Sequence, residues 1–259
     1  MLHHIKIGTG PRVMVSFHGF GRDATMFERY ESMFSDYTIY SVSLFYHGSN
    51  WEDQRAYLDD ERWTAIFGDF LLSEGIDSFS LLGFSLGGKV ALYTFQLFGD
   101  RVDELHLIAP YGIKANAVEL ITQRLPFVYR RLERYVRHPA ASLSLLAMLR
   151  RYKLLNTTLL NITIKQMSSR EARARIFYTM RLYGTLRLNL KAIRMKLEAA
   201  KVPVVFYLGV YDKILTLKAL DKYFASLVDA SLHMIPSGHS RLPDLVAQTF
   251  GEQIEHSLD

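Results

Sequence analysis

The chain has 259 residues, of which 49% are hydrophobic and 22% are charged, a composition typical of a globular protein that buries a sizeable core. It contains no cysteine, which excludes disulfides, thiolate nucleophiles and cysteine-ligated zinc sites. It shows no apolar run of signal-peptide or membrane-spanning length, so we expect a cytoplasmic protein.

The net charge of +5 conceals a strong asymmetry along the chain. Residues 113–200 hold 18 Lys or Arg against 4 Glu and no Asp, which gives this stretch a net charge of +14. The remaining residues hold 13 basic and 22 acidic side chains, a net charge of −9. The chain therefore consists of a basic insert within an acidic frame.

Short runs rich in β-branched and aromatic residues recur in the frame, each followed by glycine, proline or polar residues, and they predict strands. The runs are residues 13–17, 37–44, 79–82, 105–109, 204–208 and 231–235. Helix-like segments lie between them, notably residues 86–98 and 218–227. Strands that alternate with helices imply right-handed crossovers, so we predict an α/β fold with a mostly parallel twisted sheet flanked by helices.

The insert shows helical spacing of Leu, Tyr and Phe and no convincing strand pattern. We expect roughly three to five helices in it, as one excursion between two strands of the frame. Ser168 and Glu171 fit a capping box that opens a long helix. The predicted organisation is a core of residues 1–112 and 201–259 with a helical cap of residues 113–200.

A serine stands among glycines in residues 83–88, GFSLGG, directly after a predicted strand and before a predicted helix. A nucleophilic hydroxyl must stand clear of the backbone at such a point, which forces a tight and strained turn. Gly83 and Gly87 remove side chains that would collide around Ser85, and Gly88 lets the helix approach the sheet closely. Ser85 is therefore a candidate nucleophile; the competing interpretation is an ordinary strand-to-helix turn.

A nucleophilic serine also needs a base and a carboxylate that orients the base. His239 is the single histidine of the loop PSGHS, which follows the last predicted strand, whereas His233 lies within that strand and is expected to be structural. Asp212 follows the strand 204–208, and no Asp or Glu lies in residues 105–118. We expect His239 and Asp212 to fill these roles, although Asp212 also fits a turn residue or a partner of Lys213.

Donors for a developing oxyanion are expected in two places. The segment HGFG follows the first predicted strand, and Gly19 frees the backbone so that the N–H of Phe20 can point at the substrate oxygen. The second donor is the N–H of Leu86, which directly follows the candidate nucleophile at a helix N-terminus. Unpaired donors and the helix dipole favour negative charge there.

With HGFG, GFSLGG, Asp212 in YLGVYDKIL and His239 in PSGHSRL in this order, the chain resembles the capped serine hydrolases of the α/β-hydrolase superfamily. The resemblance covers both parts of the frame, and the insert lies where that superfamily carries its variable cap. It implies that His18 shapes the oxyanion loop and that the loop around His47 forms a pocket wall. The histidines show no pairing at metal-ligand spacing, so we predict no metal, and we expect no cofactor.

The resemblance implies hydrolysis of a carboxylic ester or thioester through an acyl-enzyme. Because this fold hosts many chemistries, two alternatives remain open. In one, the same Ser-His-Asp triad hydrolyses a carbon-carbon bond or eliminates pyruvate from a menaquinone precursor. In the other, the protein is a receptor that binds its ligand without turnover.

The basic insert bears on substrate and partners. Its charge and its Leu, Phe and Tyr content suit a pocket for a small acyl substrate, with a rim that attracts anions. They also suit peripheral contact with an anionic membrane, and the competing interpretation is a set of solvated helix faces. Nucleic acid is not an expected partner, because no recognised binding module accompanies the charge. The sequence leaves the oligomeric state open.

Overall fold

A computed structural model describes residues 2–48, 58–113, 144, 148, 151–152, 169–224, 227 and 229–255 of the chain. The chain divides into two compact units. The first unit comprises residues 1–50, 60–114 and 188–259, and the second comprises residues 51–59 and 115–187.

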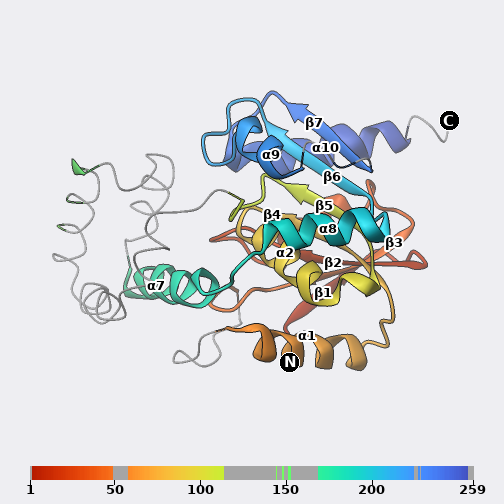
Figure 1. Cartoon of the computed structure of the whole chain (residues 1–259), viewed down its shortest axis with the longest axis horizontal. Helices are drawn as coiled ribbons and strands as arrows, with labels where there is room; N and C mark the ends of the chain where they lie inside the picture. Colours follow the sequence, from red (N-terminus) through yellow and green to blue (C-terminus); the bar gives the residue numbers. More distant parts are fainter. Residues whose placement is uncertain are drawn as a thin grey trace. The chain divides into compact units, whose positions relative to one another are not determined.

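The first unit is built on a seven-stranded sheet with the strand order β1-β3-β2-β4-β5-β6-β7 (Figure 1). β1 runs antiparallel to β3, and the other neighbouring pairs are parallel, so they need crossover connections. The strands are β1 (His4–Ile7), β2 (Arg12–Phe17), β3 (Tyr37–Val42), β4 (Phe79–Phe84), β5 (Val102–Ile108), β6 (Val204–Gly209) and β7 (Ala230–Ile235). The α-helices are α1 (Asp60–Ser73), α2 (Leu86–Phe98), α7 (Arg170–Gly184), α8 (Leu190–Ala200), α9 (Leu217–Phe224) and α10 (Leu242–Glu255). The 3-10 helices are η1 (Ala24–Tyr30), η2 (Gly99–Arg101) and η3 (His239–Arg241).

Helices cover both faces of the sheet, and the central strand β4 divides its side chains between them. Phe79 faces α1, where its ring centroid lies 5.5 Å from that of Phe67. Leu82 and Phe84 have the opposite parity along the strand and belong to the core that η1 and α10 complete. Because both faces of β4 are buried, its sequence reads as a continuous apolar run.

The predicted α/β fold with a mostly parallel sheet is confirmed. The six predicted strands are present, although several begin or end a few residues away from the predicted limits. The helix predicted over residues 86–98 is α2, with the same bounds. The strand β1 was not predicted. It lies at the sheet edge, where its four residues form a strand by pairing with β3.

Two helices of the predicted insert lie within the described residues. α7 belongs to the second unit, and its N-cap is Ser169, whose hydroxyl accepts a hydrogen bond from the N–H of Ala172 at 3.1 Å. Ser168, the residue predicted to be this N-cap, lies outside the described residues. The other helices expected in the insert lie outside them as well. α8 contacts α2 and belongs to the first unit. The two units differ from the predicted core and helical cap at residues 51–59, 113–114 and 188–200.

Each helix in the described part of the chain is too short or too polar to cross a membrane.

Candidate active site

Ser85 occupies a strained turn between β4 and α2. Its φ of 51° and ψ of −111° lie outside the regions that residues with a side chain favour. Ser85 is the N-cap residue of α2, yet its side chain makes no capping hydrogen bond, which leaves the hydroxyl for another partner. A Cβ at Gly83 would lie 2.6 Å from the carbonyl oxygen of Gly87, and one at Gly87 would lie 1.8 Å from that of Phe17. The turn therefore has this backbone path only with glycine at both positions.

Gly88, the glycine after the turn, packs closely against another segment of the chain. A Cβ at Gly88 would lie 2.6 Å from the Cβ of Pro110, in the segment that follows β5. This glycine lets the first turn of α2 pack against the neighbouring segment, which supports the close approach of helix and sheet.

The structure brings three of the predicted side chains into one hydrogen-bonded series. Nε2 of His239 lies 2.8 Å from Oγ of Ser85, and Nδ1 of His239 lies 2.6 Å from Oδ2 of Asp212. The three residues follow β4, β6 and β7, which run parallel in the sheet, so they meet at its carboxyl edge.

The carboxylate of Asp212 is fixed on both of its oxygens. Oδ1 accepts hydrogen bonds from the backbone N–H groups of Ile214 at 2.7 Å and Leu215 at 3.3 Å, while Oδ2 faces His239. Since a carboxylate accepts, the hydrogen-bond network assigns the proton of the neutral imidazole to Nδ1. Nε2 of His239 is then an acceptor for the hydroxyl proton of Ser85.

Phe84 is a site residue that the sequence pattern did not single out. Its ring packs against the imidazole of His239, with centroids 5.1 Å apart. A Cβ at Gly19 would lie 2.6 Å from Cδ1 of Phe84, so the same ring also touches the HGFG loop. In sequence this phenylalanine is indistinguishable from its apolar neighbours in β4, and only its position directly before Ser85 marks it.

His18 is buried and holds the HGFG loop through both ring nitrogens. Nε2 accepts a hydrogen bond from the N–H of Leu44 at 3.0 Å, so Nδ1 carries the proton that is donated to the carbonyl of Gly19 at 2.8 Å. Burial penalises the charged imidazolium and lowers the pKa of His18 to about 4. His18 is therefore neutral near pH 7, and that it shapes the oxyanion loop stays a prediction.

The two expected oxyanion donors lie in adjacent segments. Leu86 is the first residue of α2, where the N–H has no acceptor within the helix. Gly87, the next residue, packs against the carbonyls of Phe17 and His18 at the start of the HGFG loop. The ring of Phe20 is held edge-on against that of His47, with centroids 5.5 Å apart. That the N–H groups of Phe20 and Leu86 bind a substrate oxygen stays a prediction.

The surroundings of the remaining histidines in the described part of the chain do not indicate a catalytic role. The ring of His233 lies 5.3 Å from that of Tyr207 and 4.8 Å from that of Phe250, consistent with the structural role expected for it. His138 and His256 lie outside the described residues. Across the described ranges, no group of three or more His, Asp or Glu side chains could hold a metal ion, and the expectation of no metal stays a prediction.

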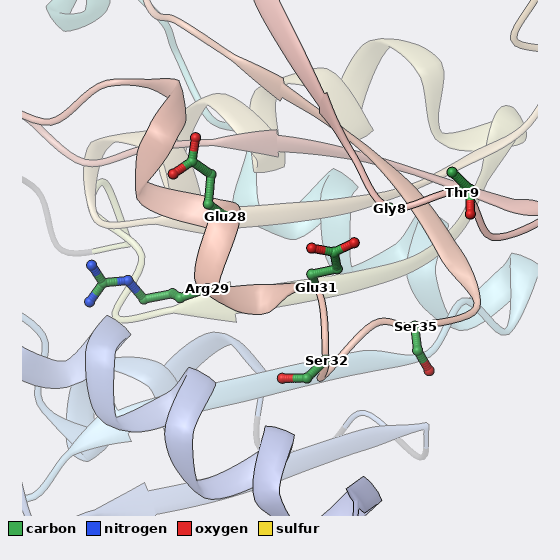
Figure 2. A pocket seen from close by; sticks show the side chains of 7 residues that line it. All are labelled: Gly8, Thr9, Glu28, Arg29, Glu31, Ser32 and Ser35. Atoms are coloured by element: carbon green, nitrogen blue, oxygen red, sulfur yellow. The ribbon is translucent and has the colours of Figure 1, made fainter.

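A surface pocket of about 490 Å³ lies away from these residues (Figure 2). Gly8, one of its lining residues, packs against the carbonyl of Tyr37, the first residue of β3, which places the pocket near the amino edge of the parallel strands. Ser85 lies at the opposite edge. The pocket is lined by Gly8, Thr9, Glu28, Arg29, Glu31, Ser32 and Ser35.

The sequence pattern of the alpha/beta hydrolase family matches residues 13–249. No curated protein matches the chain in sequence. Among solved structures, MenH from S. aureus is 20% identical, with 98% of this chain and 100% of that chain covered and a TM-score of 0.65. An enol-lactonase from Burkholderia xenovorans LB400 is 15% identical, with 99% and 96% covered and a TM-score of 0.61. A thermophilic esterase from Thermogutta terrifontis is 20% identical, with 98% and 93% covered and a TM-score of 0.64.

At such identities the solved structures show the likeness of fold alone. The family pattern shows membership of a family as well as the fold, because it matches the chain from β2 to α10 and so spans the whole parallel part of the sheet. On that ground, the chain belongs to the alpha/beta hydrolase family.

Proposed function

We propose that this chain is a serine hydrolase that cleaves a carboxylic ester or thioester through an acyl-enzyme. The observation that carries the proposal is the hydrogen-bonded series from Ser85 to His239, at 2.8 Å, and from His239 to Asp212, at 2.6 Å. A nucleophile, a base and an orienting carboxylate within hydrogen-bonding reach are what acyl transfer to serine requires.

In this mechanism Oγ of Ser85 attacks the carbonyl carbon of the substrate while Nε2 of His239 takes the hydroxyl proton. Asp212 stabilises the imidazolium that forms and holds the ring in place. The tetrahedral intermediate collapses, and the alcohol or thiol leaves with the proton from His239. Water then attacks the acyl-enzyme, His239 takes one proton from it, and the acid is released as Ser85 regains its hydrogen.

The oxyanion of each tetrahedral intermediate is assigned to the N–H groups of Phe20 and Leu86. The contacts of His18 support this assignment, because Nδ1–H donates to the carbonyl of Gly19 and Nε2 accepts from the N–H of Leu44, so both ring nitrogens are engaged in holding the HGFG loop. The strained backbone of Ser85 supports a functional role for this turn, since strained residues cluster at active sites and persist where the surrounding structure over-determines them.

The decisive test is covalent labelling by a fluorophosphonate probe. Wild-type protein is expected to be labelled, and Ser85→Ala is expected to lose the label while keeping its circular dichroism spectrum. Ser231→Ala removes an exposed hydroxyl on β7 and should label like the wild type. Absence of labelling in the wild type would remove the nucleophile from the proposal.

A panel of p-nitrophenyl and acyl-CoA esters of increasing chain length tests which acyl group the protein accepts. Turnover that depends on Ser85 supports the hydrolase. Tight ligand binding without turnover would point to a receptor instead. Labelling without turnover of any ester would point to carbon-carbon bond hydrolysis or pyruvate elimination, which a diketone substrate and a menaquinone precursor test directly.

Contact with an anionic membrane, expected from the basic insert, stays a prediction because most of the insert lies outside the described residues. Sedimentation with anionic vesicles at low and high salt tests it. Binding that salt abolishes indicates electrostatic association, and no binding at low salt contradicts it.

A further inference from the structure

We infer that His47 is a positioning residue for the oxyanion hole, because its ring holds the ring of Phe20 and thereby orients the backbone N–H of Phe20. The inference rests on the proposed function, in which this N–H binds the substrate oxygen. The resemblance to capped serine hydrolases implied only a pocket wall for the loop around His47.

The N–H of Phe20 and the carbonyl of Gly19 belong to one peptide group. Because this group is planar and trans, its N–H and its carbonyl point in opposite directions. The carbonyl accepts hydrogen bonds from Nδ1 of His18 at 2.8 Å and from the backbone N–H of Arg22 at 3.2 Å. The N–H of Phe20 therefore points away from the imidazole of His18.

The chain itself restrains this peptide group weakly, because Phe20 stands between two glycines. Gly19 precedes it, and Gly21 follows it with a φ of 75°. Glycine restricts backbone rotation less than any other residue. A small rotation of the peptide group would turn the N–H away from the substrate oxygen, so its orientation depends on contacts beyond its own backbone.

His47 contacts two rings, that of His18, which holds the carbonyl of the peptide group, and that of Phe20, which carries its N–H. The ring of His47 lies edge-on against that of Phe20, with centroids 5.5 Å apart and planes inclined by 88°. It lies 5.1 Å from the ring of His18, with planes inclined by 63°. Edge-to-face packing is a preferred arrangement of aromatic rings. One ring, in a residue that is only 1% exposed, thus braces both ends of the peptide group.

The ring of His47 is itself fixed by the loop that follows β3. Its Nδ1 donates to the carbonyl of Phe45 at 3.0 Å, and its backbone N–H donates to the carbonyl of Leu44 at 3.0 Å. The N–H of Leu44 in turn donates to Nε2 of His18 at 3.0 Å. The two loops therefore hold each other through ring contacts and through a hydrogen bond.

The backbone next to His47 is strained. Tyr46 has a φ of 67° and is only 1% exposed. A bulky residue seldom adopts a positive φ. Such strain persists where the surrounding structure over-determines the conformation, and it clusters at functional sites. The strain at Tyr46 is what a loop held in one position against the HGFG loop would show.

The test combines hydrolysis of p-nitrophenyl butyrate with inhibition by propyl trifluoromethyl ketone, which has the same alkyl chain. Oγ of Ser85 adds to the carbonyl carbon of the ketone, the hydroxyl proton passes to His239, and the carbonyl oxygen becomes an oxyanion. The affinity of the ketone therefore reports on the oxyanion hole.

Both quantities are measured for the wild type, His47→Leu, His47→Phe and His233→Leu. His47→Leu removes the aromatic ring, whereas His47→Phe keeps a ring at this position. His233→Leu is the control, because it removes a histidine ring that packs against Tyr207 and Phe250 instead.

His47→Leu is expected to lower kcat about tenfold or more and to weaken inhibition by the ketone by a similar factor. KM should change less than about twofold, since the bond to the oxyanion forms only as the tetrahedral intermediate forms. His47→Phe should restore most of both quantities, and His233→Leu should leave them unchanged. An unaltered kcat in His47→Leu, a higher KM alone, or a His47→Phe variant as slow as His47→Leu would each overturn the inference.

Circular dichroism checks that each variant folds. Phe20→Leu provides a second variant if His47→Leu does not fold, because it removes the other ring of the contact and keeps the backbone N–H. It should show the same losses in kcat and in affinity for the ketone. Full kcat in Phe20→Leu would contradict a role of the ring contact.

Failure of the proposed function is recognised separately. If the wild type neither hydrolyses the ester nor reacts with a fluorophosphonate, the catalytic proposal is lost. NMR relaxation of the Phe20 amide then tests the positioning role by itself. An order parameter of about 0.85 in the wild type that falls to about 0.6 in His47→Leu sustains it. Equal order parameters in the two proteins overturn it.

Discussion

The ring of Phe84 packs against the imidazole of His239 with ring centroids 5.1 Å apart and planes inclined by 33°. Phe84 ends β4 and directly precedes Ser85, whereas His239 begins η3 after β7. This contact links the strand of the nucleophile to the base in addition to the hydrogen bond between Nε2 and Oγ. The orientation of the imidazole therefore depends on packing as well as on hydrogen bonding.

Phe84→Leu should lower the rate of fluorophosphonate labelling by about one order of magnitude, because small displacements of a catalytic group have large effects on rate. Phe79→Leu is the matched control: Phe79 lies in the same strand, is fully buried and faces α1. Both variants should lose a similar free energy of unfolding, about 1–3 kcal/mol. If both slow labelling equally, the contact with His239 has no special role.

Asp212→Asn should retain the fold and lower kcat by about three to four orders of magnitude, since an amide can hold the imidazole in the wrong tautomer. Ester hydrolysis on the best substrate of the panel measures the loss, and circular dichroism checks the fold. Asp221→Asn, an exposed change on α9, should leave kcat unaltered. Activity of Asp212→Asn close to that of the wild type would mean that another group orients His239.

Gly87→Ala should prevent the turn around Ser85 from forming, because the added Cβ would lie 1.8 Å from the carbonyl oxygen of Phe17. We expect loss of labelling together with destabilisation of about 3 kcal/mol or more, measured by urea unfolding. Gly68→Ala makes the same chemical change within α1, where the added Cβ meets nothing within 4 Å. It should stabilise the protein by about 0.5–1 kcal/mol and keep full labelling. Equal stability of the two variants would contradict the geometry of the turn.

The surroundings of Glu104 predict how the free energy of unfolding depends on pH. Its Oε1 lies 2.7 Å from Nε2 of His106 and accepts a hydrogen bond from the hydroxyl of Tyr37 at 2.6 Å. The contact with His106, followed by that with Tyr37, lowers the pKa of Glu104 from its usual 4.5 to about 2. The folded state therefore prefers the ionised form. This contribution to stability is complete above about pH 4.5 and is lost as the pH falls from 4.5 to about 2.

Glu104→Gln should lower the free energy of unfolding by about 1–2 kcal/mol at neutral pH. The difference between wild type and variant should shrink as the pH falls below 4.5, because the wild-type carboxylate then takes up a proton on unfolding. Urea unfolding at neutral pH and near pH 3 measures the difference. Glu31→Gln, an exposed change after η1, should leave the pH dependence unaltered. A difference for Glu104→Gln that is independent of pH would contradict the lowered pKa.

Much of the fold could be predicted because its information is local. The apolar runs followed by turn residues predict the parallel strands, and the alternation of strand and helix predicts crossovers. The edge strand β1 could not be predicted in this way, since its four residues are held by pairing with residues 39–42 of β3. The N-cap of α7 also differs from the predicted one. Ser168 was predicted, whereas it is the next residue, Ser169, that bonds to the helix backbone.

The sequence by itself determined the strained turn at Ser85, because the steric demand of that turn falls on its immediate neighbours Gly83 and Gly87. The sequence also placed a histidine, His239, and an aspartate, Asp212, in the segments that follow two of the predicted strands. Only the tertiary structure decided that these side chains meet and that Phe84 packs against the imidazole. Such distances depend on how parallel strands far apart in sequence align at one edge of the sheet, and no single segment of the chain specifies that alignment.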